Sequence, residues 1–444
     1  MDVSAKPIYS FNIILDTCLS LSLILKQGHF CHMSTLQNAL REQYNSSGID
    51  LEENPLARQI ESLADENCFT ITTGQQIHFG LGPMYVLYKI WNTLALAKEL
   101  KAHFPKFHFV PIFWMAAEDH DFEEICDLKL FGRSHTWVNE QAGAVGRMNT
   151  AGLRQLITDI RSEYRLSTHQ LRFLDLAEEA YSLDNYANAS RHLLHSLFGH
   201  EGLLILDGDD QGLKESWSET VISELKGDHY KKLKASTEAL EAKGFEAQIH
   251  IRKINLFYLS ENSRERIVLK DGKFTAGDQL LCEEKDIDSF VRDQAANISP
   301  NVALRPLYQE CILPNLIYVG GPAEIKYWHQ LKGLFDHYSL HMPALYLRTS
   351  AVYLGSEIDK GLDVSELGLY YGESSALIDQ AAESMQVLRA SFDEKLNGIK
   401  GELSSYSKEF KQAVKGANLD GKINKLYPKI AELQHLSNDL IDQY

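Results

Sequence analysis

Two apolar segments of this chain each lead into polar residues that could bind or transform a small molecule. Residues 68–71 (CFTI) precede TTGQQ at 72–76, and residues 107–115 (FHFVPIFWM) precede AAEDHD at 116–121. A helical pattern at residues 85–100 separates them, so strand, helix and strand alternate. Because the carboxyl ends of parallel strands meet at one edge of a sheet, we expect these polar residues to lie together at a ligand site.

The glycine-bearing segment after the first strand suits an anionic ligand. A turn before a helix directs backbone N–H groups and the positive end of the helix dipole toward an anion. Pro83 suits the first helical turn, where its missing N–H costs nothing. The alternative is that glycine only satisfies a backbone requirement of the turn. We favour a ligand site, because two consecutive glutamines at a strand end have little use in a core. Its candidate residues are Thr73, Gly74, Gln75, Gln76, Gly82, Tyr85 and Lys89.

The acidic run after the second strand, Glu118, Asp119, His120 and Asp121, could perform acid–base chemistry. A carboxylate can orient or deprotonate an amine, and an imidazole can relay the proton. Neighbouring side chains of a strand point to opposite sides, so at most two of the four face one site. We favour Asp119 and His120 for that role. The alternative for the others is a solvated acidic loop, with Asp121 as a helix N-cap.

Two later motifs add candidates for the same site. Asn301 and Arg305 lie four residues apart after a Ser-Pro pair. An arginine can clamp a carboxylate through two parallel hydrogen bonds, although a buried salt bridge is nearly as good an interpretation of Arg305. Gly320 and Gly321 follow an apolar strand expected at 313–319 and precede a helix expected at 324–338, which begins with Glu324. This repeats the strand–turn–helix pattern of the first motif.

Composition narrows the classes of partner. The chain has 444 residues and a formal charge of −17, which argues against nucleic acid and anionic membranes as partners. An anion such as ATP would therefore need Mg²⁺ or local cations, for which Lys89, Arg305, Lys326 and Arg348 are candidates. The six cysteines form no C-x-x-C pair, which fits a reducing cytoplasm. No resident metal site is predicted.

The chain divides into three regions by pattern. We expect an N-terminal helical segment at 1–66, an α/β core with a mostly parallel sheet at 67–373, and a helical arm at 374–444. Within the core, a helical insertion is expected at about 140–200 and a small β insertion at about 248–290. Apolar residues from Leu388 to Leu440 recur every three or four positions, which favours a coiled-coil arm and a homodimer.

Taken in order, four segments resemble motifs of the cysteine-adding enzyme of bacillithiol biosynthesis. They are TTGQQ at 72–76, AEDHDFEE at 117–124, residues 301–314, and GGPAEIKYW at 320–328, within a resemblance that covers roughly residues 69–348. Where the family commonly has Gly-Pro-Gly-Glu, this chain has Gly-Pro-Ala-Glu, with Ala323 as the departure. The resemblance implies a Rossmann-like core with insertions and a coiled-coil arm used in dimerisation.

The resemblance also implies a reaction, in which cysteine is joined to glucosaminyl-malate by an amide bond in the last step of bacillithiol synthesis. It leaves ATP and Mg²⁺ open as activators. With no Cys/His or Ser/His nucleophile pattern, proximity and charge stabilisation would carry such a ligation. Two alternatives are a metal-dependent hydrolase built on residues 118–121, which lacks a second group of ligands, and a catalytically impaired dimerising scaffold with a shortened arm.

Overall fold

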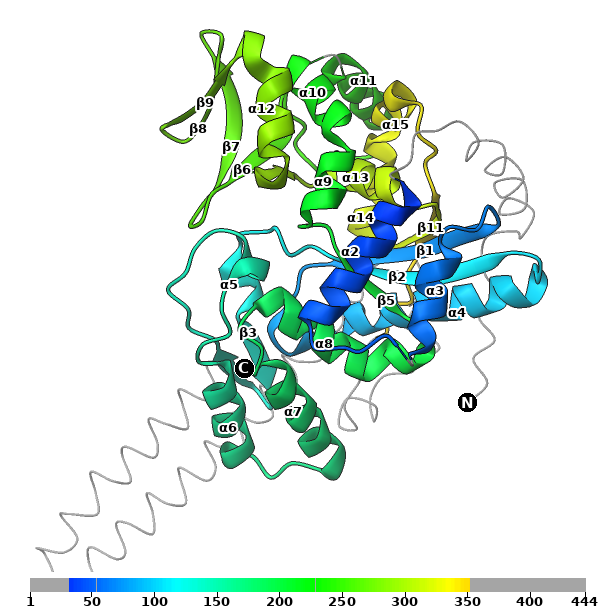
Figure 1. The fold of residues 1–444 in the computed structure, drawn as a ribbon, viewed down its shortest axis with the longest axis vertical. Coiled ribbons are helices and arrows are strands. Elements are labelled where there is room, and N and C mark those ends of the chain that lie inside the picture. Colours follow the sequence, from blue (N-terminus) through cyan, green and yellow to red (C-terminus); the bar gives the residue numbers. More distant parts are fainter. Residues whose placement is uncertain (1–31, 53, 228, 352–444) are drawn as a thin grey trace, which may run out of the picture. The chain divides into compact units, whose positions relative to one another are not determined.

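The computed structural model describes residues 32–52, 54–227 and 229–351 (Figure 1). The predicted coiled-coil arm at 374–444 and the first 31 residues lie outside the described residues. The chain separates into two compact units, and the first ends at Ala351. All elements below belong to that first unit.

A central sheet of five parallel strands organises this unit, in the order β12-β11-β1-β2-β5. Its strands are β1 (Cys68–Gln75), β2 (His108–Met115), β5 (Leu204–Asp207), β11 (Asn315–Gly320) and β12 (Ala344–Leu347). When these strands are numbered 1 to 5 in chain order and read from the β5 edge of the sheet, their order is 3-2-1-4-5, as in a Rossmann sheet. The strand order reverses between β1 and β11. In such sheets the ligand binds outside the carboxyl ends of the strands at this reversal.

Both faces of the sheet are buried, which explains the continuous apolar strands in the sequence. Alternate residues of β2 enter different cores: Ile112 and Trp114 pack with the first core cluster, and Phe113 and Met115 with the second. The second cluster includes residues of the helix α4 (Met84–His103), which connects β1 to β2. The predicted α/β core with a mostly parallel sheet is therefore confirmed, and helices pack on both of its faces.

The described part of the N-terminal segment packs directly against this sheet. It forms α2 (Met33–Ser46) and α3 (Pro55–Ser62). The Tyr44 hydroxyl accepts a hydrogen bond from the N–H of Ile205 at 3.0 Å, and the Gln43 amide donates to the carbonyl of Asp207 at 3.0 Å. These bonds fasten α2 to β5, so the segment is part of the sheet's own core.

The chain after β2 forms an insertion of short elements. It begins with α5 (Phe122–Ile125) and a two-stranded hairpin, β3 (Asp127–Leu130) with β4 (Arg133–Thr136), which the sequence patterns did not indicate. Three helices follow within the range expected to be helical: α6 (Leu153–Glu163), α7 (Thr168–Ala180) and α8 (Tyr186–Phe198). They pack on the second core cluster.

A second sheet of five antiparallel strands lies between β5 and β11 in the sequence, in the order β10-β6-β7-β8-β9. Its strands are β6 (Leu256–Leu259), β7 (Arg264–Lys270), β8 (Lys273–Ala276), β9 (Gln279–Glu283) and β10 (Ile298–Pro300). The helices of the same stretch are α9 (Gln211–Ser216), α10 (Ser218–Lys226), α11 (Tyr230–Glu241), α12 (Ile287–Gln294) and α13 (Arg305–Ile312). The small β insertion expected from residue 248 thus starts as a strand at Leu256.

Two local predictions need correction. The single helix expected at 324–338 is two helices, α14 (Pro322–Gln330) and α15 (Lys332–Tyr338). The break brings Gly333 against α11, where a Cβ would lie 2.5 Å from the carbonyl of Lys232. Gly74 does not form a turn: it lies inside β1 and pairs with Trp114 of β2. A Cβ at Gly74 would lie 3.3 Å from the carbonyl oxygen of Trp114, so close strand packing limits the size of this residue.

Among the described helices, none has the length and apolar character needed to cross a bilayer.

The carboxyl group of Glu310 is buried in the core, next to β11. Glu310 of α13 is 3% exposed, and its Oε1 accepts hydrogen bonds from the amides of Gln309 and Asn315, each at 2.9 Å. Asn315 in turn accepts from the hydroxyl of Thr72 at 2.8 Å. Burial raises the pKa of Glu310 to about 8, so the folded protein holds this group protonated at neutral pH.

We expect Glu310→Gln to remove a pH dependence of stability. The folded pKa of about 8 lies above the ordinary 4.5, so the folded state binds an extra proton between these values. Stability from this group is complete below the ordinary pKa and is lost as pH rises through about 8. Urea unfolding at pH 5 and pH 9 should show that the variant gains stability over wild type with rising pH, by an amount on the order of a few kcal/mol. The same change at the exposed Glu66 should leave the pH dependence as in wild type, and equal slopes for all three proteins would contradict the prediction.

Candidate functional site

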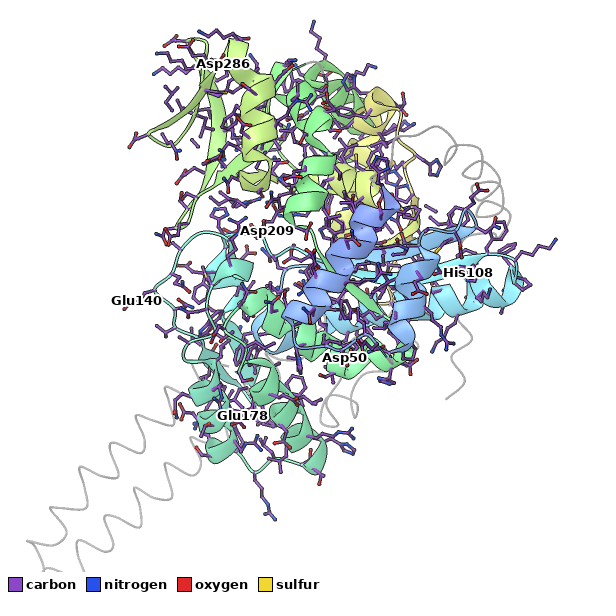
Figure 2. All side chains as sticks on the ribbon, in the orientation of Figure 1. Asp50, His108, Glu140, Glu178, Asp209 and Asp286 are labelled. Atoms are coloured by element: carbon purple, nitrogen blue, oxygen red, sulfur yellow. The ribbon has the colours of Figure 1, made fainter. Side chains whose placement is uncertain are left out.

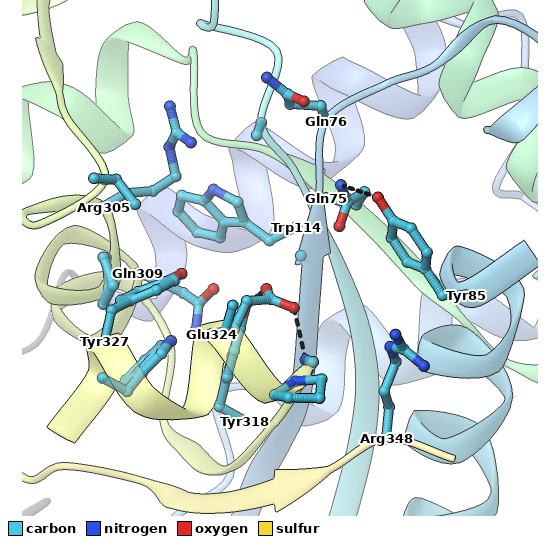
Figure 3. A pocket seen from close by; sticks show the side chains of 18 of the residues that line it. Gln75, Gln76, Tyr85, Trp114, Arg305, Gln309, Tyr318, Glu324, Tyr327 and Arg348 are labelled. Atoms are coloured by element: carbon cyan, nitrogen blue, oxygen red, sulfur yellow. Dashed lines mark hydrogen bonds between the residues drawn. The ribbon is translucent and has the colours of Figure 1, made fainter. Parts of the chain in front are cut away.

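A pocket of about 350 Å³ opens at the carboxyl edge of the central sheet, where the strand order reverses between β1 and β11 (Figure 3). This size suits a small molecule. Strand ends, α4, α13, α14 and the residue after β12 all contribute to its wall. The predicted site residues that line it are Gly74, Gln75, Gln76, Tyr85, Asp119, Arg305, Gly321 and Glu324. The predicted site residues outside the lining are Thr73, Gly82, Lys89, Glu118, His120, Asp121, Asn301 and Gly320.

A buried ion pair between Glu324 and Lys89 forms one side of the pocket. The Lys89 ammonium donates to both carboxylate oxygens of Glu324, at 2.9 and 2.8 Å, and to the carbonyl of Gly74 at 2.6 Å. Burial lowers the pKa of Lys89, and the charge of Glu324 opposes that effect. The Lys89 side chain is 0% exposed and that of Glu324 is 23% exposed. Lys89, predicted to contact an anionic ligand, therefore has its ammonium engaged inside the protein.

A backbone N–H at the start of α14 also has its hydrogen-bond acceptor within the protein. The second carboxylate oxygen of Glu324 accepts the N–H of Gly321 at 2.7 Å, and the Tyr318 hydroxyl donates to the first at 2.8 Å (Figure 3). This is the N3-to-N-cap bond of a capping box. The N–H of Gly321, which the sequence pattern assigned to an anionic ligand, already has an acceptor. A ligand at this turn could therefore use only backbone groups other than the N–H of Gly321.

Three predicted residues have clear structural positions beside the pocket. Thr73 donates through its hydroxyl to the carbonyl of Val319 at 2.7 Å and so links β1 to β11. Gly82 has φ +68°, and a Cβ there would lie 2.7 Å from Cβ of His78, so only glycine fits this approach to α4. Asn301 caps the turn before α13 by accepting the N–H of Ala303 at 2.9 Å.

Asp119 is the carboxylate that enters the pocket from the end of β2. It accepts from the amide of Gln76 at 3.2 Å and pairs with Arg264 at 3.3 Å and Arg305 at 3.6 Å. Burial alone would raise the pKa of Asp119, but the Arg305 and Arg264 guanidinium groups outweigh it and hold the pKa below its usual value. A carboxylate that holds protons so weakly is suited to accept a hydrogen bond from a substrate N–H and poorly suited to take the proton itself.

His120 lies beside Asp119 but at the rim. Its side chain is 42% exposed, its Nδ1 lies 3.2 Å from Nη1 of Arg264, and its Nε2 lies 3.8 Å from Asp121. In the described ranges, Asp119, His120 and Asp121 are the one group whose ligand atoms gather closely enough, within 4.8 Å, to share a cation. Two guanidinium groups already compensate the charge of Asp119, which disfavours a divalent ion there. The hydrolase alternative therefore gains no support from the geometry.

Glu118 points away from Asp119 into a separate buried network at the end of β5. Its carboxylate lies 2.7 Å from the ammonium of Lys214, which lies 2.7 Å from Asp209. Asp209, labelled in Figure 2, also pairs with Arg147 at 2.6 Å. The alternation of side chains along an extended chain explains why Glu118 and Asp119 serve different environments.

One residue close to the site was missed by sequence reasoning. Arg264 begins β7 of the antiparallel sheet, and its guanidinium stacks 4.1 Å from the ring centroid of Phe257. It donates to the carbonyl of Pro300 at 2.9 Å and reaches Asp119 from there. The local sequence around Arg264 reads as an ordinary charged strand. Only the tertiary structure, which brings the start of β7 to the residues after β2, shows its position at the site.

The fold and the pocket define a Rossmann-type α/β protein with a cavity of small-molecule size at the switch point of its sheet. The chain belongs to the BshC family of bacillithiol biosynthesis, since the model of the family's N-terminal Rossmann-like domain matches residues 7–349. That range also includes N-terminal residues before 69, which the motif resemblance did not reach.

Two relatives illustrate the similarity. A protein of Flavobacterium psychrophilum named "Putative cysteine ligase BshC" is 38% identical over 371 residues, which cover 82% of this chain and 69% of that protein. A protein of the same name from Flavobacterium johnsoniae is 42% identical over 320 residues, covering 71% and 60%. The matches thus span between three fifths and about two thirds of these relatives' lengths.

We expect Lys89→Met to destabilise the protein through the charge it leaves on Glu324. Removing one partner of a buried pair costs about 3–5 kcal/mol, and the lower end applies because Glu324 is partly exposed. Urea unfolding of the double variant Lys89→Met with Glu324→Gln should recover more than half of the loss. The matched control is Lys234→Met, which breaks an exposed pair with Glu238 and should cost less than about 1 kcal/mol. A Lys89→Met protein as stable as wild type would rule out the structural role.

Proposed function

We propose that this protein is a ligase that joins the carboxyl group of cysteine to the amino group of glucosaminyl-malate, forming the amide bond of bacillithiol as the final step of its synthesis. The observation that carries the proposal is Asp119. An ionised carboxylate flanked by Arg305 lies in a pocket at the switch point. Membership of the family and the names of the relatives support the same reaction.

The residues of the pocket suit the handling of an amine and a carboxylate. The carboxylate of Asp119 would hold and orient the substrate nitrogen, and Arg305 would bind a carboxylate group of the substrate. Gln76, which contacts Asp119, would keep that carboxylate in place. Trp114 and Tyr327 line the same cavity and would help to keep water from the reacting groups (Figure 3).

Amide formation joins the amine nitrogen to the cysteine carbonyl carbon, expels a leaving group from that carbon and releases a proton from nitrogen. Because Asp119 holds protons weakly, His120 is the better acceptor for that proton and can pass it to solvent from the rim. The proposal includes ATP with Mg²⁺ as the source of the leaving group. The described residues offer arginines for phosphate groups, since Lys89 and the N–H of Gly321 are already engaged.

The proposed reaction is tested by mixing the purified chain with cysteine, glucosaminyl-malate, ATP and Mg²⁺ and detecting bacillithiol by mass spectrometry after thiol labelling. We expect product only when all substrates are present. Omission of ATP tests the activation step separately from ligation. A folded chain that binds both substrates and forms no bacillithiol would refute the proposed activity.

We expect Asp119→Asn and His120→Gln each to lower kcat by about a hundredfold or more, the range usual for a lost acid–base or orienting group. Asp119→Asn should also raise KM, because the substrate nitrogen loses a charged hydrogen-bond acceptor, while His120→Gln should act mainly on kcat. Steady-state assays of product formation measure both constants. The control is His108→Gln, at the opposite end of β2 from the pocket. Turnover near the wild-type value in either site variant would show that its role is wrongly assigned.

We also propose that residues 374–444 form a coiled-coil arm through which two copies associate in the bacterial cytoplasm. The support is the apolar spacing in the sequence, including Leu388, Phe392, Leu396, Ile399 and Leu403. Scattered cysteines without a C-x-x-C pair support the compartment.

The arm makes a prediction about the oligomeric state. We expect a concentration-dependent equilibrium between monomer and dimer, because short apolar stripes bury little surface. Leu396→Asp should shift this equilibrium to monomer, since it places a charge in the stripe. Sedimentation velocity over a range of concentrations measures the effect. The same single species for wild type and variant would remove the arm as a dimer element.

A further inference from the structure

We infer that Arg348 forms a second anion-binding subsite in the pocket, separate from the end that holds Arg305 and Asp119. The ligand, or the pair of ligands bound together, would then present two oxyanion groups at opposite ends of the cavity. The inference rests on the proposed function only in taking this pocket as the substrate site.

The position of Arg348 is fixed by its backbone. Its N–H donates to the carbonyl of Gly320 at 2.9 Å, which extends the pairing of β12 with β11 by one residue. The next residue, Thr349, is held to α4: its N–H donates to Oδ1 of Asn92 at 2.6 Å, and Nδ2 of Asn92 donates to its hydroxyl at 3.1 Å. The Arg348 side chain therefore starts from a rigid strand end.

Its guanidinium lies at the opposite side of the pocket from that of Arg305. Figure 3 shows Trp114, Gln75 and Glu324 between the two arginines. The Arg348 guanidinium carbon lies 5.1 Å from the ring centroid of Tyr85, a distance at which an aromatic face attracts a cation. The two guanidinium groups thus belong to different ends of the cavity.

Both arginines keep hydrogen-bonding capacity for a ligand. The Nε atoms of Arg305 and Arg348 are each buried and have no hydrogen-bond partner within the described structure. Nη1 of Arg348 donates only to its neighbours, to the carbonyl of Thr349 at 3.0 Å and the hydroxyl of Ser350 at 3.1 Å. A buried donor without an acceptor costs about 1–3 kcal/mol, so a carboxylate or phosphate oxygen there would relieve a real deficit.

The charges around the pocket are not balanced. Its two carboxylates already have close cationic partners, since Glu324 pairs with Lys89 and Asp119 pairs with Arg264. Arg305 lies at 3.6 Å from Asp119, which thus serves two arginines. Among the described residues, no carboxylate lies within 4.0 Å of the Arg348 guanidinium. In a chain with a formal charge of −17, this excess of cations in one cavity favours a dianionic content.

The test measures binding of two probes, L-malate for carboxylates and inorganic pyrophosphate for phosphates, to the full chain by isothermal titration calorimetry. Quenching of tryptophan fluorescence gives a second readout, because Trp114 and Trp328 line the pocket. We expect Arg348→Gln to weaken at least one probe tenfold or more, and the affected probe identifies the oxyanion. Arg266→Gln, at an exposed position of β7, is the matched control and should stay within twofold of wild type.

Arg348→Lys keeps the charge and provides the answer should the glutamine variant not fold. It should bind the same probe three- to tenfold more weakly than wild type, since an ammonium cannot reproduce the planar contact of a guanidinium. Affinities within twofold of wild type in the folded Arg348 variants, or no binding of either probe to wild type, would overturn the subsite. The measurement needs no turnover, so a chain that binds the probes through Arg348 and makes no bacillithiol would refute the ligase proposal alone.

Discussion

The ion pair between Lys89 and Glu324 is the interaction on which the site depends. It joins α4, which follows β1, to α14, which follows β11, across the point where the strand order of the sheet reverses. A charged pair in so buried a position is stable only when its remaining hydrogen-bonding groups are satisfied. Here Gly74, Tyr318 and Gly321 supply those partners. The pair therefore holds two strand ends and two helix starts at fixed separations, and the pocket is the space that remains between them.

This arrangement changes what the site can recognise. In many Rossmann sheets, a helix N-terminus and a glycine-rich turn bind the phosphate groups of the ligand. In this protein Glu324 occupies the N–H at the start of α14, and Gly74 lies within a strand. In the proposed site, anion recognition would pass to the guanidinium groups of Arg305 and Arg348, which present flat, directional donors to carboxylates or phosphates.

The second sheet completes the site from outside the Rossmann core. Arg264 reaches Asp119 from β7 and is itself fixed by Phe257 and the carbonyl of Pro300. On the far side of the same strand end, Lys214 holds Glu118 together with Asp209. The residues after β2 are thus paired with cations from two elements, β7 and α9, of the chain between β5 and β11. Together with Arg305, Arg264 explains why Asp119 remains ionised although it is largely buried.

The sequence alone indicated the strands that became β1, β2 and β11, the helix between β1 and β2, the small β insertion and the segments that meet at the pocket. These follow from local patterns: apolar runs, turn residues and the rule that ligands bind at the carboxyl ends of strands. Asp119, Arg305, Gln75 and Gln76 were predicted to lie together, and the structure brings them to one cavity. Tertiary structure decided the function of individual side chains. Lys89 is neutralised rather than free because it pairs with Glu324, which lies more than a hundred residues away in the sequence. Glu118 turns away from the pocket that Asp119 enters because it pairs with Lys214, which lies about a hundred residues away. Electrostatic energy depends on distance in space and on burial, and neither is encoded in the spacing of residues along the chain.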